Sequence, residues 1–141
     1  KLVDINYHIY GSTKYLEKYG IPKTTNDLNK HRFISFGKGA PSPVFNPDWA
    51  LKLGNKDSKK RKPIMKVNSV MGLLLAVESG VGLAALPDYL VSQSQNVIKV
   101  LPKSEGPITE AHFVYPQSLK NVARVQAFRN FLYSKLSETK F

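Results

Sequence analysis

Residues 67–87 carry the clearest succession of hydrophobic patterns in the chain, which predicts a strand, a helix and a second strand. Apolar side chains recur every three or four residues at Val70, Leu73, Leu74 and Val77. Ser69 precedes them at a position where its hydroxyl can accept a hydrogen bond from a free backbone N–H. Gly80 follows them where a left-handed residue commonly ends a helix. We therefore expect the helix to run between Ser69 and Gly80.

The junction before this helix is the part with functional interest. The free N–H groups and the positive end of the helix dipole face whatever lies beyond the carboxyl end of the preceding strand. After the helix, residues 83–86 form a short and wholly apolar run, typical of a strand that is covered on both faces. Pro87 then pre-sets the first turn of another helix.

Strands and helices alternate along the rest of the chain, which indicates an α/β sandwich. We expect strands at residues 1–10, 32–36, 62–67, 97–101 and 110–115. Helices are expected at residues 13–19, in a short turn after Thr25, from Pro87 to about residue 92, and from Ser118 to the end. The last helix has the strongest periodicity, with apolar side chains at Leu119, Val122, Val125, Phe128, Leu132 and Leu136. The segment 49–53 reads as extended and would form a hairpin with 62–67.

The basic charge of the chain leaves two interpretations open. The 141 residues carry a net charge of +11, which suits either a nucleic-acid-binding module or an ordinary domain with a basic surface. The true cluster of basic residues is 59–62, which could contact phosphates or form a solvated hairpin tip. No helix-turn-helix pattern or aromatic RNA-binding motif accompanies it.

Several classes of protein are disfavoured by the composition. The absence of cysteine excludes disulfides and thiolate metal sites and fits a reducing compartment. His8, His31 and His112 lie far apart, and no Gly-x-Ser-x-Gly elbow is present, so we expect neither an enzyme nor a metal or cofactor site. There is no run of 18 apolar residues and no signal peptide. The chain lacks an initiator Met, from which we expect a fragment of a longer protein.

A binding cleft is the remaining functional signal. In open α/β sheets, ligands bind outside the carboxyl ends of the strands. Ser12 and Ser69 begin predicted helices directly after strands, and Gly37 follows another strand. Their hydroxyl and backbone N–H groups suit a small anion. The alternative is that the two serines only cap their helices.

A series of segments, taken in order, resembles the effector-binding domain of LysR-type transcriptional regulators. These segments are 10–16 with Gly20 and Pro22, 27–28 with His31, 67–69, 76–77, 80–82, 86–87, 100–102, 114–116 and 128–132. The resemblance implies a type II periplasmic-binding-protein-like fold, a three-layer α/β sandwich with one complete subdomain and part of a second. Residues 11–110 would form the complete second subdomain. Residues 1–10 and 111–141 would supply the crossover strands and the returning helix of the first subdomain.

In this family a small effector settles between the subdomains and alters the oligomer and its bend in the DNA. The resemblance therefore implies a bacterial, cytoplasmic regulator that forms a dimer or tetramer. DNA binding is expected only of the full-length protein, through an N-terminal winged helix-turn-helix outside this chain. The alternatives are a fragment of a solute-binding protein or a basic nucleic-acid-binding module.

The same resemblance assigns the effector-binding residues to the second-subdomain wall of the cleft. They are Ser35, Phe36, Gly37, Val67, Asn68 and Ser69, with Ser12 as a weaker candidate. We expect Asn68 and Ser69 to donate hydrogen bonds to the effector and Phe36 to shape the pocket. No catalytic residue, cofactor or metal is expected.

Overall fold

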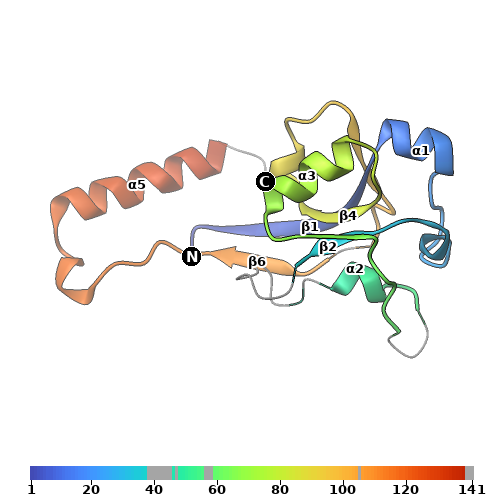
Figure 1. Ribbon diagram of the computed structural model, residues 1–141. Helices are drawn as coiled ribbons and strands as arrows, with labels where there is room; N and C mark the ends of the chain where they lie inside the picture. The colour runs from blue at the N-terminus through green and yellow to red at the C-terminus, as the bar shows by residue number, and fades with distance from the viewer. Residues whose placement is uncertain (38–45, 47, 56–58, 105, 139–141) are drawn as a thin grey trace.

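The computed structural model describes residues 1–37, 46, 48–55, 59–104 and 106–138. In chain order the elements are β1 (Val3–Ser12), α1 (Thr13–Tyr19), η1 (Asp27–Lys30), β2 (Ile34–Phe36), α2 (Trp49–Lys52), β3 (Met65–Val67), α3 (Val70–Glu78), β4 (Ala84–Pro87), α4 (Asp88–Val91), β5 (Val97–Val100), β6 (Ile108–Ala111), η3 (Gln117–Leu119) and α5 (Ala123–Glu138). The predicted alternation of strands and helices is therefore confirmed (Figure 1).

The long strand β1 organises the sheet. Its second half pairs antiparallel with β4 on one side and with β5 on the other, while its first half pairs with β6. Strands β2 and β3 run parallel, and a parallel bridge between Phe33 and Leu83 joins β2 to β4. The strand order is thus β3-β2-β4-β1-β5, with β1 opposite in direction to the others. The carboxyl ends of β2, β3 and β4 meet at one side of the sheet, which we call the carboxyl edge.

Helices cover both faces of this sheet and enclose two hydrophobic clusters. The first cluster includes Tyr15 from α1, Leu28 from η1 and Leu51 from α2. The second lies beneath α3 and α4 and includes Leu73, Leu74, Val77 and Val91. Alternate residues of β1 enter opposite clusters, as the two-residue period of a strand requires: Ile9 the first, Tyr10 the second. The result is a three-layer α/β sandwich.

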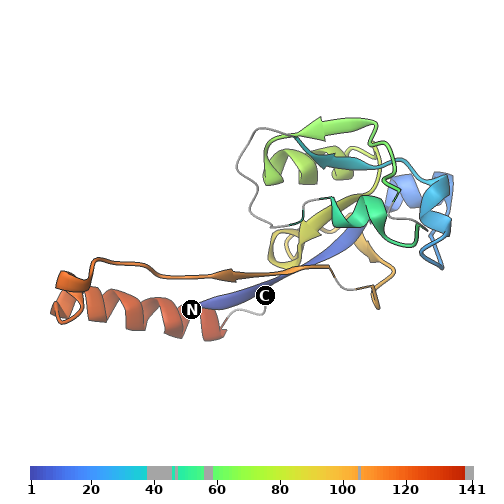
Figure 2. The same cartoon turned by 90° about the horizontal axis from the view of Figure 1, so that it is seen from below.

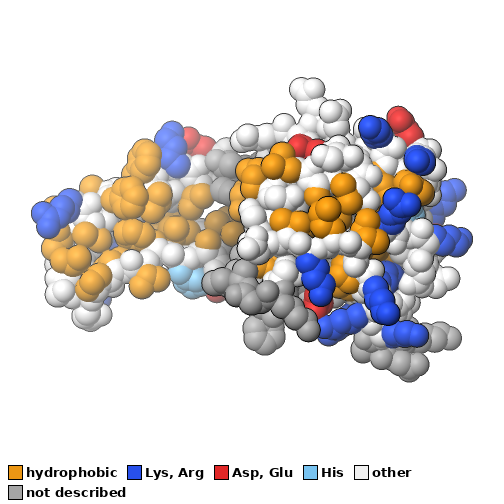
Figure 3. All heavy atoms as spheres, in the orientation of Figure 1, with side chains coloured by type: hydrophobic (Ala, Val, Ile, Leu, Met, Phe, Trp, Pro, Cys, Tyr) orange, Lys and Arg blue, Asp and Glu red, His pale blue; other side chains and the backbone are white. Residues whose placement is uncertain are grey.

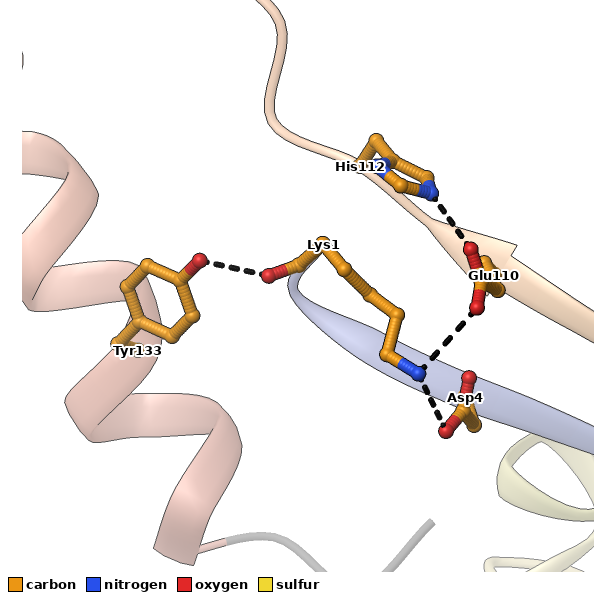
Figure 4. A network of polar contacts seen from close by, with 5 residues as sticks. All are labelled: Lys1, Asp4, Glu110, His112 and Tyr133. Carbon is orange, nitrogen blue, oxygen red and sulfur yellow. Dashed lines mark hydrogen bonds and ion pairs between the residues drawn. The ribbon is translucent and has the colours of Figure 1, made fainter.

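Strands β1 and β6 leave this body as a two-stranded arm, and α5 runs back alongside the extended chain that follows β6 (Figure 2). The hydroxyl of Tyr133 in α5 donates to the carbonyl oxygen of Lys1 at 2.6 Å (Figure 4). The ammonium of Lys1 in turn lies 2.9 Å from the Asp4 carboxylate and 3.3 Å from that of Glu110. These exposed contacts join α5 to both strands of the arm, and no described residue of α5 is buried.

The expected hairpin is wrong. Residues 49–53 were expected to be extended, but Trp49–Lys52 form the helical turn α2. Strand β3 pairs in parallel with β2 instead of antiparallel with this segment. A short apolar run does not distinguish a buried helical turn from a strand. Here the helical turn is favoured because it buries two adjacent side chains, Ala50 and Leu51, in the same cluster.

Other boundaries also move. The strand expected at 110–115 is β6, Ile108–Ala111. The final helix begins at Ala123 and not after Ser118, which lies in the separate 3-10 turn η3. Pro87 is the N-cap residue of α4 and not part of its first turn. Several residues lie outside the described part of the chain: Lys38 and Gly39, which follow Gly37, the prolines Pro41, Pro43 and Pro47, and Lys56.

Candidate functional site

The two ends of α3 have the structure that the sequence predicts. The hydroxyl of Ser69 accepts a hydrogen bond from the backbone N–H of Gly72 at 3.3 Å. Gly80 follows the last turn with a φ of 77°, in the left-handed region. Leu73, Leu74 and Val77 are buried as expected, whereas Val70 is only partly buried. The start of α3 is therefore fixed by a cap and by a buried face.

The carboxyl edge brings Gly37, Asn68 and Ser69 together. Phe36 and Val67 lie opposite each other in the parallel pair of β2 and β3. The backbone N–H of Gly37 donates to the carbonyl of Val67 at 2.9 Å. A Cβ built on Gly37 would lie 3.8 Å from the backbone nitrogen of Asn68. Gly37 therefore lies beside the residue that precedes the N-cap of α3, and it places no side chain there.

Burial separates these residues into two groups. Asn68 and Ser69 are exposed, and Gly37 is partly exposed, so all three are accessible from solvent. Phe36 is partly buried and packs against the second cluster. Ser35 is only 6% exposed, and its hydroxyl oxygen has no hydrogen-bond partner within the described part of the chain. Because side chains alternate along a strand, Ser35 and Phe36 point to opposite faces of the sheet.

Ser12 lies away from this group. Its hydroxyl accepts from the backbone N–H of Tyr15 at 3.3 Å, and the residue is 1% exposed. A Cβ on Gly80 would lie 3.7 Å from the Ser12 hydroxyl oxygen, which puts Ser12 beside the last turn of α3. The nine residues of α3 separate the two ends of the helix by about 13 Å. Ser12 caps α1 and does not join Ser69 at the carboxyl edge.

A polar network at the carboxyl edge was not predicted from the sequence. The Asp88 carboxylate, at the end of β4, accepts from the Tyr10 hydroxyl at 2.8 Å and from the Lys99 ammonium at 2.9 Å. The same carboxylate lies 2.8 Å from Nδ1 of His8. These partners lie between 11 and 80 positions away along the chain, so no local spacing reveals them.

The electrostatics of this network favour an ionised Asp88. Burial alone raises the pKa of Asp88, but the hydrogen bonds from Lys99, His8 and Tyr10 outweigh it and lower that pKa below its usual range. Burial, together with the bond to Asp88, raises the pKa of the Tyr10 phenol. The ionised carboxylate therefore links β1, α4 and β5 at the carboxyl edge.

A cavity of about 280 Å³ lies at the base of the arm. It is lined by Asn6, Tyr7, His8, Gly106 and Ile108. Tyr7 is the register partner of Pro87, so the cavity belongs to the same edge as Ser69. None of the residues that the sequence predicts for the site lines it.

Two side chains of the basic segment 59–62, those of Lys60 and Arg61, make contacts within the protein. The Lys60 ammonium pairs with Asp48 at 2.6 Å. The guanidinium of Arg61 donates to the backbone carbonyls of Ala50, Leu51 and Thr25, and it lies 5.6 Å from the ring centre of Phe33. Arg61 thus holds the loop against the body and is not available to a phosphate.

Two further observations concern the described residues. They contain no group of three His, Cys, Asp or Glu side chains arranged to hold a metal ion. No helix within them is long and apolar enough to cross a membrane.

Comparison with known proteins gives consistent results. The family described as "LysR substrate binding domain" matches residues 1–137. An HTH-type transcriptional regulator of Haemophilus influenzae, described as uncharacterised, is 30% identical over 120 residues, which cover 82% of this chain and 40% of that protein. An HTH-type regulator of Xanthomonas campestris is 28% identical over 97% of this chain and 41% of its own length. The chain thus spans about two fifths of the length of these relatives.

The solved structures agree with the family match. The regulatory domain of CrgA, a LysR-type transcriptional regulator from Neisseria meningitidis, superposes with a TM-score of 0.73 at 25% identity, over 96% of this chain and 66% of that one. The regulatory domain of AphB from Vibrio vulnificus has the same fold, with a TM-score of 0.69 at 17% identity over 95% and 67%. The expected periplasmic-binding-protein-like architecture is therefore confirmed, and the chain belongs to the LysR substrate-binding domain family.

Proposed function

We propose that this chain is the effector-sensing part of a bacterial, cytoplasmic transcription regulator and that it holds a small anion at the carboxyl edge. The effector would lie against Gly37, Asn68 and Ser69, in a cleft whose other wall is the first subdomain. Residues 11–110 would form the second subdomain, and residues 1–10 and 111–141 would supply the crossover strands and the returning helix. DNA binding and assembly into a homo-oligomer would belong to the full-length protein.

The observation that carries this proposal is the meeting of Gly37 with Asn68, the residue before the N-cap of α3. The exposed Asn68 and Ser69 offer amide and hydroxyl groups beside Gly37, whose missing side chain leaves the approach open. The dipole of α3 adds positive potential at this end. The Asp88 network also supports the proposal, because its hydrogen bonds fix the carboxyl end of β4, the strand next to β2.

Sensing would follow from a difference in affinity between two domain arrangements. An effector that contacts both walls of the cleft binds the closed arrangement more tightly than the open one. It shifts the population only by the ratio of those two affinities. The arm formed by β1 and β6 joins the two walls in this proposal, so it would carry the change in domain angle.

The test is a reporter assay with the full-length regulator and a panel of small carboxylates. Ser69→Ala removes one hydrogen bond to a charged ligand, worth about 1.5–3 kcal/mol. We expect the panel compound that gives the largest response to be needed at a concentration about tenfold or more higher. Ser69→Ala also removes a helix cap, at a cost of about 1 kcal/mol in stability.

The matched control is Ser12→Ala, which removes the equivalent cap of α1 away from the carboxyl edge. It is expected to leave the dose response unchanged, and DNA binding without effector should be normal in both variants. A Ser69→Ala regulator with an unchanged dose response would contradict the proposed site.

The match to HTH-type regulators favours this function over a solute-binding fragment. The internal contacts of Lys60 and Arg61 weaken the case for a basic nucleic-acid-binding module.

A further inference from the structure

An open groove of about 570 Å³ lies between the loop after α1 and the turn after β5. Its walls are residues 21–25 and 99–104, both at the end of the molecule away from α5 (Figure 2). Small-molecule sites commonly have volumes of about 300–1,000 Å³. The groove shares no residue with the group formed by Gly37, Asn68 and Ser69.

The groove is also distant from that group. Strand β5 lies at one lateral edge of the sheet, and β3 lies at the other. Four strand spacings of about 4.8 Å separate them, which amounts to roughly 19 Å. A ligand in the groove would therefore not contact the first turn of α3.

The groove has an apolar surface. Ile21, Pro22 and Leu101 line it, together with Val100 and Pro102. The large apolar side chain of Ile21 is 59% exposed. A ligand that covers Ile21 would remove this side chain from water.

The backbone at Leu101 is strained. Its φ is 50°, within the described residues the only positive value at a residue other than glycine. A branched side chain rarely takes this conformation, and the residue after it is proline, which restricts the backbone further. The carbonyl of Leu101 accepts from the backbone N–H of Ser104 at 2.8 Å, which closes the turn. The strain is concentrated in the wall of the groove, where strain often accompanies ligand contact.

Cationic groups border this apolar surface. Lys23 and Lys103 line the groove, and both residues are exposed. The nearby Asp27 carboxylate accepts hydrogen bonds from the backbone N–H groups of Lys23 and Thr24 and from the Thr24 hydroxyl. It also lies 3.6 Å from the ammonium of Lys30. The Asp27 carboxylate is therefore already bonded to groups of its own turn.

The third lysine of the groove is already paired. The Lys99 ammonium bonds to Asp88, and so its charge is compensated. Within the described part of the chain, neither Lys23 nor Lys103 has an ion pair. The ammonium groups of Lys23 and Lys103 are therefore available to pair with the anionic group of a ligand.

We propose that this groove is a second ligand site, separate from the group formed by Gly37, Asn68 and Ser69, for a small amphipathic carboxylate. The apolar part of the ligand lies on Ile21 and Leu101, and its carboxylate lies between Lys23 and Lys103. The proposal does not depend on the effector site at Ser69.

The experiment follows methyl signals of Ile, Leu and Val in the full-length protein during titration with benzoate, and with benzyl alcohol as the neutral analogue. We expect saturable shifts of Ile21, Val100 and Leu101. Benzoate should bind at least tenfold more tightly than benzyl alcohol. The double variant Lys23→Glu/Lys103→Glu should weaken benzoate binding at least tenfold, whereas Lys120→Glu, an exposed lysine on another element, should not.

Three results would overturn the proposal. The first is the absence of saturable shifts at Ile21 and Leu101. The second is equal affinity for benzoate and benzyl alcohol, which would indicate an apolar patch without anion recognition. The third is loss of these shifts in Ser69→Asp, because it would place the ligand beside Ser69. An unchanged groove titration in Ser69→Asp supports two separate sites, whether or not the effector proposal holds.

Discussion

Asp88 connects three elements of the fold through a single carboxylate. Its partners come from β1, through His8 and Tyr10, and from β5, through Lys99. The side chain of Asp88 is 19% exposed, so water competes only weakly for these bonds. Removing one partner of such a set leaves the others unpaired in a half-buried place, which is more costly than the net value of one bond.

We therefore expect Asp88→Asn to lower the free energy of unfolding by about 1–3 kcal/mol near neutral pH. The folded-state pKa of Asp88 lies below its value in the unfolded chain, so the stabilisation is complete above about pH 5 and is lost as the pH falls through the folded-state pKa. The stability gap between wild type and Asp88→Asn should be constant from pH 5 to 8 and should shrink below pH 4. Urea unfolding at several pH values measures this.

Asp4→Asn is the control for this prediction. Asp4 pairs with Lys1 on the exposed arm, where an ion pair contributes little. The unfolding free energy of the Asp4→Asn variant should lie within about 0.5 kcal/mol of the wild-type value. A gap for Asp88→Asn that persists unchanged at low pH would contradict the role given to the ionised carboxylate.

Among the secondary-structure elements, α3 is the one that the local sequence predicts best. Its cap, its buried stripe and its end are all local signals, and all three are confirmed at Ser69, Leu73 and Gly80. The four-residue turn α2 had no such signals, and tertiary packing determined it. The parallel partner of β3 could not be predicted either, because strand pairing depends on contacts between distant segments.

The end of α3 allows a clean test of backbone conformation. A Cβ on Gly80 would meet nothing closer than 3.7 Å, so Gly80→Ala changes little except the strain of a φ of 77°. We expect a loss of about 1–2 kcal/mol in unfolding free energy. Gly37→Ala is the matched control, because Gly37 has no positive φ and its Cβ would make ordinary contacts. Equal stabilities of the two variants in urea unfolding would argue against a left-handed cap.

At the scale of the whole molecule, α5 and the arm present a large apolar surface. Figure 3 shows hydrophobic side chains gathered over α5. Phe128 and Phe131 are 51% and 55% exposed, although Phe128 belongs to the periodic apolar series that predicts this helix. The periodicity predicts the helix correctly, but burial depends on a packing partner, and no described residue of α5 is buried. The CrgA regulatory domain is half as long again, which leaves room for that partner.

We accordingly expect Phe128 and Phe131 to be buried in the full-length protein. Phe128→Ser and Phe131→Ser should each lower its unfolding free energy by about 2 kcal/mol or more. Ala127→Ser, on the same helix and exposed, should change it by less than about 0.5 kcal/mol. Phenylalanine variants as stable as Ala127→Ser in thermal unfolding would mean that this face stays open.

The candidate site was predicted in part. Family resemblance and cap signals together selected Gly37, Asn68 and Ser69, which the fold brings to one edge. They also selected Ser12, which lies at the far end of α3 because β1 runs opposite to its neighbours. Strand direction is a property of the whole sheet, and no pattern within residues 1–20 encodes it. The same holds for Asp88, whose partners meet only after folding.

Anion binding beside Ser69 is tested by the affinity of the full-length protein for the most active carboxylate of the reporter panel, measured by calorimetry in Ser69→Asn and Ser69→Asp. Both residues cap a helix about as well as serine, so neither variant should lose stability. Ser69→Asp, however, adds a negative charge at about 4 Å from the proposed anion, where repulsion in a partly exposed site reaches several kcal/mol. We expect affinity near wild type for Ser69→Asn and at least a tenfold loss for Ser69→Asp. Equal affinities of the two variants would contradict anion binding beside Ser69.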